Sequence, residues 1–210
     1  MSDTTIDEDD ILQFDEENGP IIGYNFPPNI KHIDFYNYRH SLVGVDFPPL
    51  QSIYIEFYNL SLHGVNFQNV KKLLLNDCLD IPELNLFSII IKNVKLNNII
   101  LSNINEVKLI KCNIGELFAN NIDKLTIDKC CISHVQIDVN YLKYIKDKIS
   151  RPIFSIKCHT IEVDNFNDFD SMYLSNDMII KTGQKIDDNR FCLIGPNTYR
   201  YNNFGMVFID

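Results

Sequence analysis

Residues 104–132 read INEVKLIKCNIGELFANNIDKLTIDKCCI, a stretch in which one apolar pattern occurs twice. The first copy places its apolar and cysteine side chains at Ile104, Val107, Leu109, Cys112 and Ile114. The second copy places them at Ile122, Leu125, Ile127, Cys130 and Ile132. A short pattern that recurs in this way predicts a solenoid, because one such unit cannot bury its apolar face alone and must stack on its neighbours.

Further copies precede and follow this stretch, and most of them start about 16 to 20 residues apart, as solenoid coils do. They begin near Ile30, Leu50, Val70, Leu86, Leu142 and Ile153. The central residues of each copy alternate with a period of two, which predicts a short strand with one face in the core. We therefore predict a β-rich solenoid over residues 21–163, in which the strands of successive coils stack in parallel.

The cysteines of the pattern occupy the position three residues after the strand, where the chain turns inward. Cys78, Cys112 and Cys130 stand there, and we expect them to hydrogen-bond backbone groups of neighbouring coils. Val94 and Tyr58 replace cysteine in two copies. The arms that return to the next strand are short and rich in Asn, so we expect extended or 3₁₀ segments there rather than α-helices.

Two segments flank the repeats. Residues 1–20 contain eight acidic side chains and no Lys or Arg, which predicts a solvated, flexible acidic N-terminal arm. Ile11, Leu12 and Phe14 are exceptions that could dock on the first repeat or on a partner. Residues 164–210 contain short apolar runs between turn signals, and we predict a β-rich C-terminal cap with strands near 178–180, 191–194 and 206–209.

Charge and composition exclude several classes of function. The formal net charge is −9, and the eight acids of residues 1–20 leave the remainder of the chain near −1. Without a dense basic face, we expect no binding to nucleic acid and none to an anionic membrane. No secretory signal or apolar stretch long enough to span a bilayer is evident, and the six cysteines form no C-x-x-C pair. We expect reduced cysteines in a cytoplasmic protein.

Cysteine and acidic clusters do not predict a metal or a cofactor. A zinc site needs four convergent ligands, whereas Cys112 and Cys130 should point into the turn and Cys131 away from it. The acids Asp7 to Asp10 lack the glycine and the distant glutamate of an EF-hand loop. No nucleophile elbow or phosphate-binding loop occurs either. We therefore expect no catalytic residues, no metal and no cofactor.

The L-x-x-L-x-L-x-x-C-x-L spacing over residues 26–163 resembles the leucine-rich repeat family. The segments FPPNIKHIDF and FPPLQSIYIEF are also similar to the FNIP repeats of slime moulds and giant DNA viruses. This resemblance implies a leucine-rich-repeat-like stack of parallel short strands that acts as a protein-interaction scaffold. It also implies an accessory or virion protein of a large DNA virus, located in the host cytoplasm or in the virion.

In such a scaffold the outward positions of the strands bind the partner. An apolar patch with flanking lysines lies at these positions, and contiguous exposed apolar side chains usually mark a contact surface. The predicted partner-binding residues are Tyr36, Tyr54, Leu74, Ile90, Lys92, Lys108 and Ile110. The alternative is that the acidic arm or the C-terminal segment covers this patch.

The sequence thus favours a non-enzymatic scaffold for a protein partner whose identity and whose oligomeric state it does not reveal. The alternative is a parallel β-helix enzyme acting on polysaccharide. Such an enzyme needs a groove lined with carboxylates, whereas the outward positions mix Ser, Lys, Tyr and Ile. Glu56 and Glu106 are also predicted to lie far apart in the stack.

Overall fold

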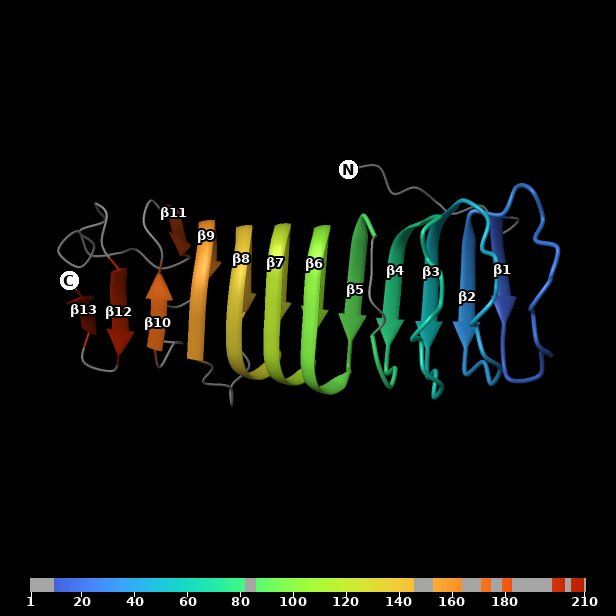
Figure 1. Ribbon diagram of the computed structural model, residues 1–210, viewed down its shortest axis with the longest axis horizontal. Helices are drawn as coiled ribbons and strands as arrows, with labels where there is room; N and C mark the ends of the chain where they lie inside the picture. The colour runs from blue at the N-terminus through green and yellow to red at the C-terminus, as the bar shows by residue number, and fades with distance from the viewer. Residues whose placement is uncertain are drawn as a thin grey trace.

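The protein is an elongated stack of β-strands laid side by side, as the computed structural model in Figure 1 shows. The structure describes residues 10–81, 86–145 and 153–163, together with four short strands nearer the C-terminus. The described residues contain no α-helix, and therefore none long and apolar enough to span a membrane. The predicted β-solenoid is confirmed.

Thirteen strands form one sheet in the described part of the chain. The first five are β1 (Ile11–Phe14), β2 (His32–Tyr36), β3 (Leu50–Glu56), β4 (Val70–Asn76) and β5 (Ser88–Lys92). Four longer strands follow, namely β6 (Lys95–Ile110), β7 (Asn113–Asp128), β8 (Cys131–Ile145) and β9 (Ile153–Val163). The last four are β10 (Ser171–Leu174), β11 (Ile179–Thr182), β12 (Thr198–Asn202) and β13 (Gly205–Ile209).

The strands β1 to β9 run parallel, and each pairs in register with the next one along the chain. Ile53 of β3 pairs with Leu73 of β4, 20 residues later. Leu109 of β6 pairs with Ile127 of β7, 18 residues later. The repeat spacing read from the sequence is therefore the length of one coil, and equivalent residues of successive coils stand side by side in columns.

Each coil turns a corner directly after its strand, at one residue whose φ is positive. Six successive corners use this left-handed conformation, at Asn37, Phe57, Asp77, Asn93, Lys111 and Lys129, with φ between 51° and 54°. Asn and Asp tolerate it best among residues with a side chain, because their short polar groups bond the local backbone. A second series of corners, at Asn103 and Asn121, divides β6 and β7 into two arms.

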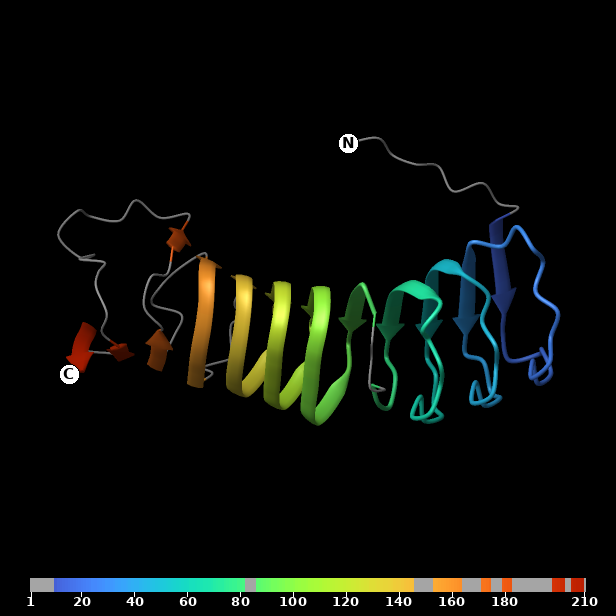
Figure 2. The same ribbon diagram turned by 45° about the horizontal axis from the view of Figure 1, so that its top comes forward.

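The return arms differ along the stack (Figure 2). Between β1 and β4 they are loops with tight turns at Gly23, Gly44 and Gly64, all with positive φ. In β6, β7 and β8 the return arm is itself a strand that pairs with its neighbours, so these elements are 15 or 16 residues long. The extended return arms predicted from the Asn-rich sequence are confirmed for β6, β7 and β8.

One continuous core fills the stack, and its composition changes along it. The N-terminal coils bury aromatic rings, with Phe14 stacked on Phe35 and Phe47 stacked on Phe67 at centroid distances of 5.3 and 5.8 Å. The coils of β6 to β8 bury Ile, Leu, Val, Ala and Cys instead, with Tyr144 as an exception.

Strands outside the regular coils close both ends. Strand β1 lies within the predicted acidic arm. It pairs with β2, so Ile11, Leu12 and Phe14 dock on the first repeat, which is one of the two possibilities that the sequence left open. The β-rich C-terminal cap is confirmed, because β12 and β13 form an antiparallel pair beside β10. The predicted strand at residues 191–194 lies outside the described residues.

Candidate partner-binding face

We define the outer face as the side chains of β2 to β8 that point away from the core. They form three columns. The first column contains His32, Ser52, Lys72, Ser88, Glu106, Lys124 and Tyr141. The second contains Asp34, Tyr54, Leu74, Ile90, Lys108, Thr126 and Lys143. The third contains Tyr36, Glu56, Asn76, Lys92, Ile110, Asp128 and Ile145.

All seven predicted partner-binding residues lie on this face and in register with one another. Tyr36 is the most open of them, with 56% of its surface exposed. Tyr54, Leu74, Lys92, Lys108 and Ile110 are half-buried. Ile90 is only 9% exposed between Leu74 and Lys108, so it offers less surface to a partner than the other six do.

The part of the outer face on β3 and β4 is organised around the amide of Asn76. Its Nδ2 donates to the carboxylate of Glu56 and, at 3.4 Å, to the hydroxyl of Tyr54. Its Oδ1 accepts from Nδ2 of Asn93 at 2.7 Å. Burial raises the pKa of the Tyr54 phenol, and the hydrogen bond and charge of Glu56 raise it further. The phenol therefore stays neutral and its ring is held in place.

The part of the outer face on β6 and β7 carries its own counter-ions. Oε1 of Glu106 lies 3.3 Å from Nζ of Lys108 and 3.4 Å from Nζ of Lys124. Burial tends to raise the pKa of Glu106, but its bonds and charge interactions with the two lysines outweigh it and lower that pKa. Farther along, Nζ of Lys143 pairs with Glu162 at 2.7 Å. Each of these lysines thus has a carboxylate partner, although Lys108 and Lys124 share the single charge of Glu106.

The carboxylates of Asp34 and Glu56 differ from Glu106 in this respect. Within the described part of the chain, neither forms an ion pair with a Lys or Arg. Burial raises the pKa of Asp34, and the nearby charge of His32 lowers it only in part. His32 itself is held by Ser52, with 2.8 Å between Nδ1 and Oγ. The N-terminal part of the outer face therefore carries negative charge without a fixed cation.

Sequence reasoning missed Phe57, which stands at the corner beside this region. Its ring meets that of Tyr36 edge to face, with centroids 5.6 Å apart, and 43% of its surface is exposed. An alignment of the residue that directly follows each strand could have revealed it. The equivalent corners of the other coils carry Asn, Asp or Lys, so an aromatic residue there has no counterpart.

The cysteines act as the sequence predicted. Sγ of Cys112 lies 3.4 Å from the carbonyl oxygen of Ile91, and the Cys112 N–H donates to Sγ of Cys130 at 3.3 Å. Burial raises the pKa of the Cys78 thiol to about 11. Cys131 is exposed and diverges from the buried pair. In residues 10–81 and 86–145, where side chains are described, no cluster of His, Cys and carboxylates could hold a metal ion.

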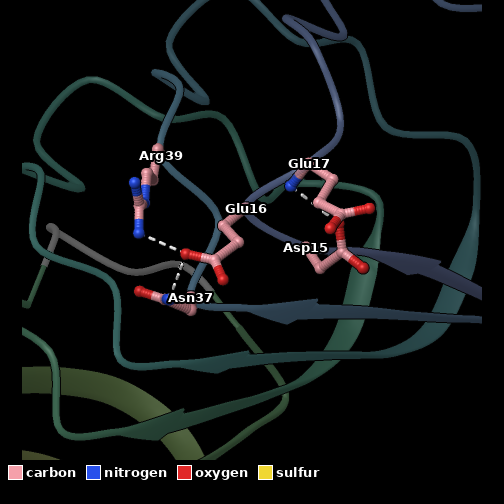
Figure 3. A network of polar contacts seen from close by, with 5 residues as sticks. All are labelled: Asp15, Glu16, Glu17, Asn37 and Arg39. Carbon is pink, nitrogen blue, oxygen red and sulfur yellow. Dashed lines mark hydrogen bonds and ion pairs between the residues drawn. The ribbon is translucent and has the colours of Figure 1, made fainter.

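The described part of the acidic arm is tied to the first coils rather than laid across the outer face (Figure 3). Glu16 accepts hydrogen bonds from Asn37, at 3.0 Å, and from Arg39, both of which follow β2. Asp10 pairs with Lys31 in the same way. The alternative prediction is that the arm or the C-terminal segment covers the patch. For residues 1–9 and for the C-terminal segment, it depends on side chains that lie outside the described residues.

Comparison of the chain with family models, curated proteins and solved structures finds no match. The solenoid is compatible both with a binding scaffold and with an enzyme acting on polysaccharide, since a fold does not determine its function. The arrangement of side chains on the outer face must therefore carry the functional argument.

Proposed function

We propose that the protein is a non-enzymatic scaffold that binds a protein partner through the outer face of β2 to β6. The observation that carries the proposal is the row of side chains in register on these strands, which ends in the exposed ring of Tyr36. Tyrosine is enriched among the residues that dominate binding energy at interfaces.

The rigidity of the face supports this role. Each outward side chain stands on a strand that is paired on both sides, and Asn76 further fixes Tyr54 and Glu56. Side chains that are already ordered lose little conformational entropy when a partner docks, which favours affinity. The similarity to leucine-rich and FNIP repeats supports a role as an accessory or virion protein of a large DNA virus, with its partner in the host cytoplasm or the virion.

Site-specific photo-cross-linking tests the proposal. A photoreactive phenylalanine analogue is placed at Tyr36 on the outer face, or at Ile100 on the return arm of β6. Ile100 is the better exposed of the two, at 74%, so it controls for non-specific capture. We expect a defined protein adduct from position 36 in cells that express the protein, and none of the same mass from position 100.

A second variant connects the adduct to the face itself. Leu74→Glu places a charge in the middle column, between Tyr54 and Ile90. We expect it to abolish the adduct from position 36 while the circular dichroism spectrum is retained. Equal adducts from positions 36 and 100, or an adduct unchanged by Leu74→Glu in a folded protein, would refute the proposal.

A further inference from the structure

The exposed aromatic pair of Tyr36 and Phe57 lies beside Asp34 and Glu56, two outer-face carboxylates that form no ion pair with a Lys or Arg of the described residues. Tyr36 of β2 is the register partner of Glu56 on β3, and Phe57 follows Glu56 directly in the chain. Asp34 stands two residues before Tyr36 on the same face of β2. Two rings and two negative charges therefore meet at one end of the outer face.

The backbone at Phe57 indicates that this ring is retained for a reason other than stability. Its φ is 53°, in the left-handed region, where a bulky side chain is a genuine outlier. The equivalent residues Asn37 and Asn93 show that asparagine fits this corner. Phe57 also leaves 43% of its surface exposed, so the core gains little from it. Strain that the fold could avoid points to a surface role.

The charges nearby determine what the rings can receive. Glu56 is oriented by the Asn76 amide, and Asp34 lies close enough to Tyr54 to affect its phenol. A cation placed over an aromatic ring is attracted by the ring's quadrupole, and it would also supply the counter-ion that these carboxylates lack. An anionic or purely apolar group would meet uncompensated negative charge instead.

We propose that Tyr36, Phe57, Asp34 and Glu56 form a receptor for an arginine side chain of the partner protein. Arginine fits better than lysine, because its planar guanidinium can stack on a ring while its N–H groups bond carboxylate oxygens. This inference rests on the proposed function, since it names the chemistry by which the partner engages the face. The β6–β7 half is not an equivalent site, because its Glu106 already binds two lysines.

Peptide titration monitored by ¹⁵N-HSQC spectra tests the receptor on the full chain. The probes are three blocked pentapeptides with alternating glycine and either arginine, lysine or glutamate. We expect the arginine peptide to shift the amide resonances of Tyr36 and Phe57 in a saturable manner, the lysine peptide to bind at least threefold more weakly, and the glutamate peptide to cause no shift. Equal shifts from all three peptides would overturn the proposal.

Two matched variants locate the binding. Glu56→Gln removes a carboxylate at the site and should weaken arginine-peptide binding at least fivefold. Glu106→Gln removes a carboxylate on the same face but outside the site, and it should leave the affinity unchanged. If both substitutions weaken binding equally, the peptide senses only the overall charge of the face and the receptor is refuted.

Phe57→Asn separates binding from folding, because the two should move in opposite directions. The substitution relieves the strained corner, so the urea midpoint should rise, whereas the arginine-peptide affinity should fall at least threefold. A variant that is more stable and binds the peptide as well as the wild type does would overturn the role of the ring. If the peptide fails to bind while the adduct from position 36 persists, the partner engages the face by other chemistry and only this inference fails.

Discussion

The coils of β1 to β4 and those of β6 to β8 share one sheet and one series of corners, yet they close in different ways. The first group returns through loops and takes about 20 residues a coil. The second returns through a second strand and takes about 18. The difference shows that the sheet constrains only the alternating strand and its corner, while the return arm sets the volume that the core must fill.

The core residues follow that volume. At the position after the corner, the coils of β2 and β3 carry Tyr38 and Tyr58, whereas the coils from β4 onward carry Cys78, Val94, Cys112 and Cys130. All six side chains are buried at 6% exposure or less. Because interiors pack at crystal-like density, the longer looped coils fill this position with aromatic rings, and the shorter coils fill it with small side chains.

The largest effect that we predict comes from removing a ring in the looped coils. Phe47 is 3% exposed and its ring lies 5.8 Å from that of Phe67 and 6.1 Å from that of Phe26. We expect Phe47→Ala to lower the free energy of unfolding by about 4 kcal/mol, because it leaves a cavity between stacked rings. Urea denaturation of the full chain measures this loss.

Two controls show whether the aromatic core is what matters. Leu117→Ala, at a fully buried position in β7, should cost about 3 kcal/mol, because less volume is lost. Phe87→Ala, at a position 63% exposed, should cost less than about 0.5 kcal/mol. An equal loss for Phe47→Ala and Leu117→Ala would contradict the contrast between the two cores, and an equal loss for Phe47→Ala and Phe87→Ala would mean that burial of the ring is not the cause.

The next largest effect concerns glycines, which serve the two regions differently. A Cβ added to Gly115 in β7 would lie 2.4 Å from the backbone oxygen of Asn97 in β6. Gly44 has free space around it but a φ of +82°. We expect Gly115→Ala to cost about 2 to 3 kcal/mol through overpacking. Gly44→Ala should cost about 1 kcal/mol, through backbone strain alone.

Thermal unfolding of both glycine variants tests this difference in mechanism. Gly19 has neither a close neighbour within 4 Å nor a positive φ, so Gly19→Ala is the matched control and should be nearly neutral. If Gly44→Ala were more damaging than Gly115→Ala, the close stacking of the β6 and β7 return arms would not be the tighter constraint.

A smaller effect should follow from the hydroxyl of Tyr58, which secures a looped return arm. It accepts the N–H of Leu42 at 3.1 Å and donates to the carbonyl of His40 at 3.0 Å. We expect Tyr58→Phe to lower stability by about 1 to 2 kcal/mol, because two backbone groups lose their partner. Tyr38→Phe removes a hydroxyl that donates to the carbonyl of Gly19 in a part-buried position, whereas the Leu42 N–H that Tyr58 satisfies is buried, so Tyr38→Phe should cost less. Denaturant midpoints that rank the two variants in the reverse order would contradict this assignment.

The sequence predicts the sheet better than it predicts the site. The inner and outer columns follow from period-two alternation and from the repeat, so residues such as Leu73 and Leu74 could be assigned to opposite faces. The faces of the return arm of β7 are harder to predict from the sequence, because its buried residues Ile114, Leu117 and Ala119 break strict alternation near Gly115. The burial of Ile90 and the corner role of Phe57 depend on neighbours from other coils, which one repeat does not reveal.

The smallest predicted effect returns to the carboxylate of Asp34 on the outer face. Burial raises its pKa in the folded protein, so the folded state holds this proton more tightly than the unfolded chain does. Its contribution to stability is therefore fully present below the ordinary aspartate pKa of 3.8 and is lost as the pH rises through the raised value. At neutral pH the ionised group is a net cost, and Asp34→Asn should raise the free energy of unfolding by less than about 1 kcal/mol.

The pH dependence of that gain decides whether Asp34 is responsible. The polar groups that face it are His32 on its own strand, Tyr54 on β3 and Gln13 on β1, and of these His32 opposes the shift. The advantage of Asp34→Asn should appear only above the raised pKa and should grow in a His32→Gln background, because the favourable charge is then absent.

Urea midpoints measured between pH 3 and pH 7, roughly across the range in which carboxylates titrate, test this. An advantage that is constant over the range would instead mean that the substitution acts through packing, since only the wild-type carboxylate titrates. A gain that vanishes when the arginine peptide saturates the wild-type protein would further show that a bound cation relieves the same cost, which joins the stability of the looped coils to the function of their outer face.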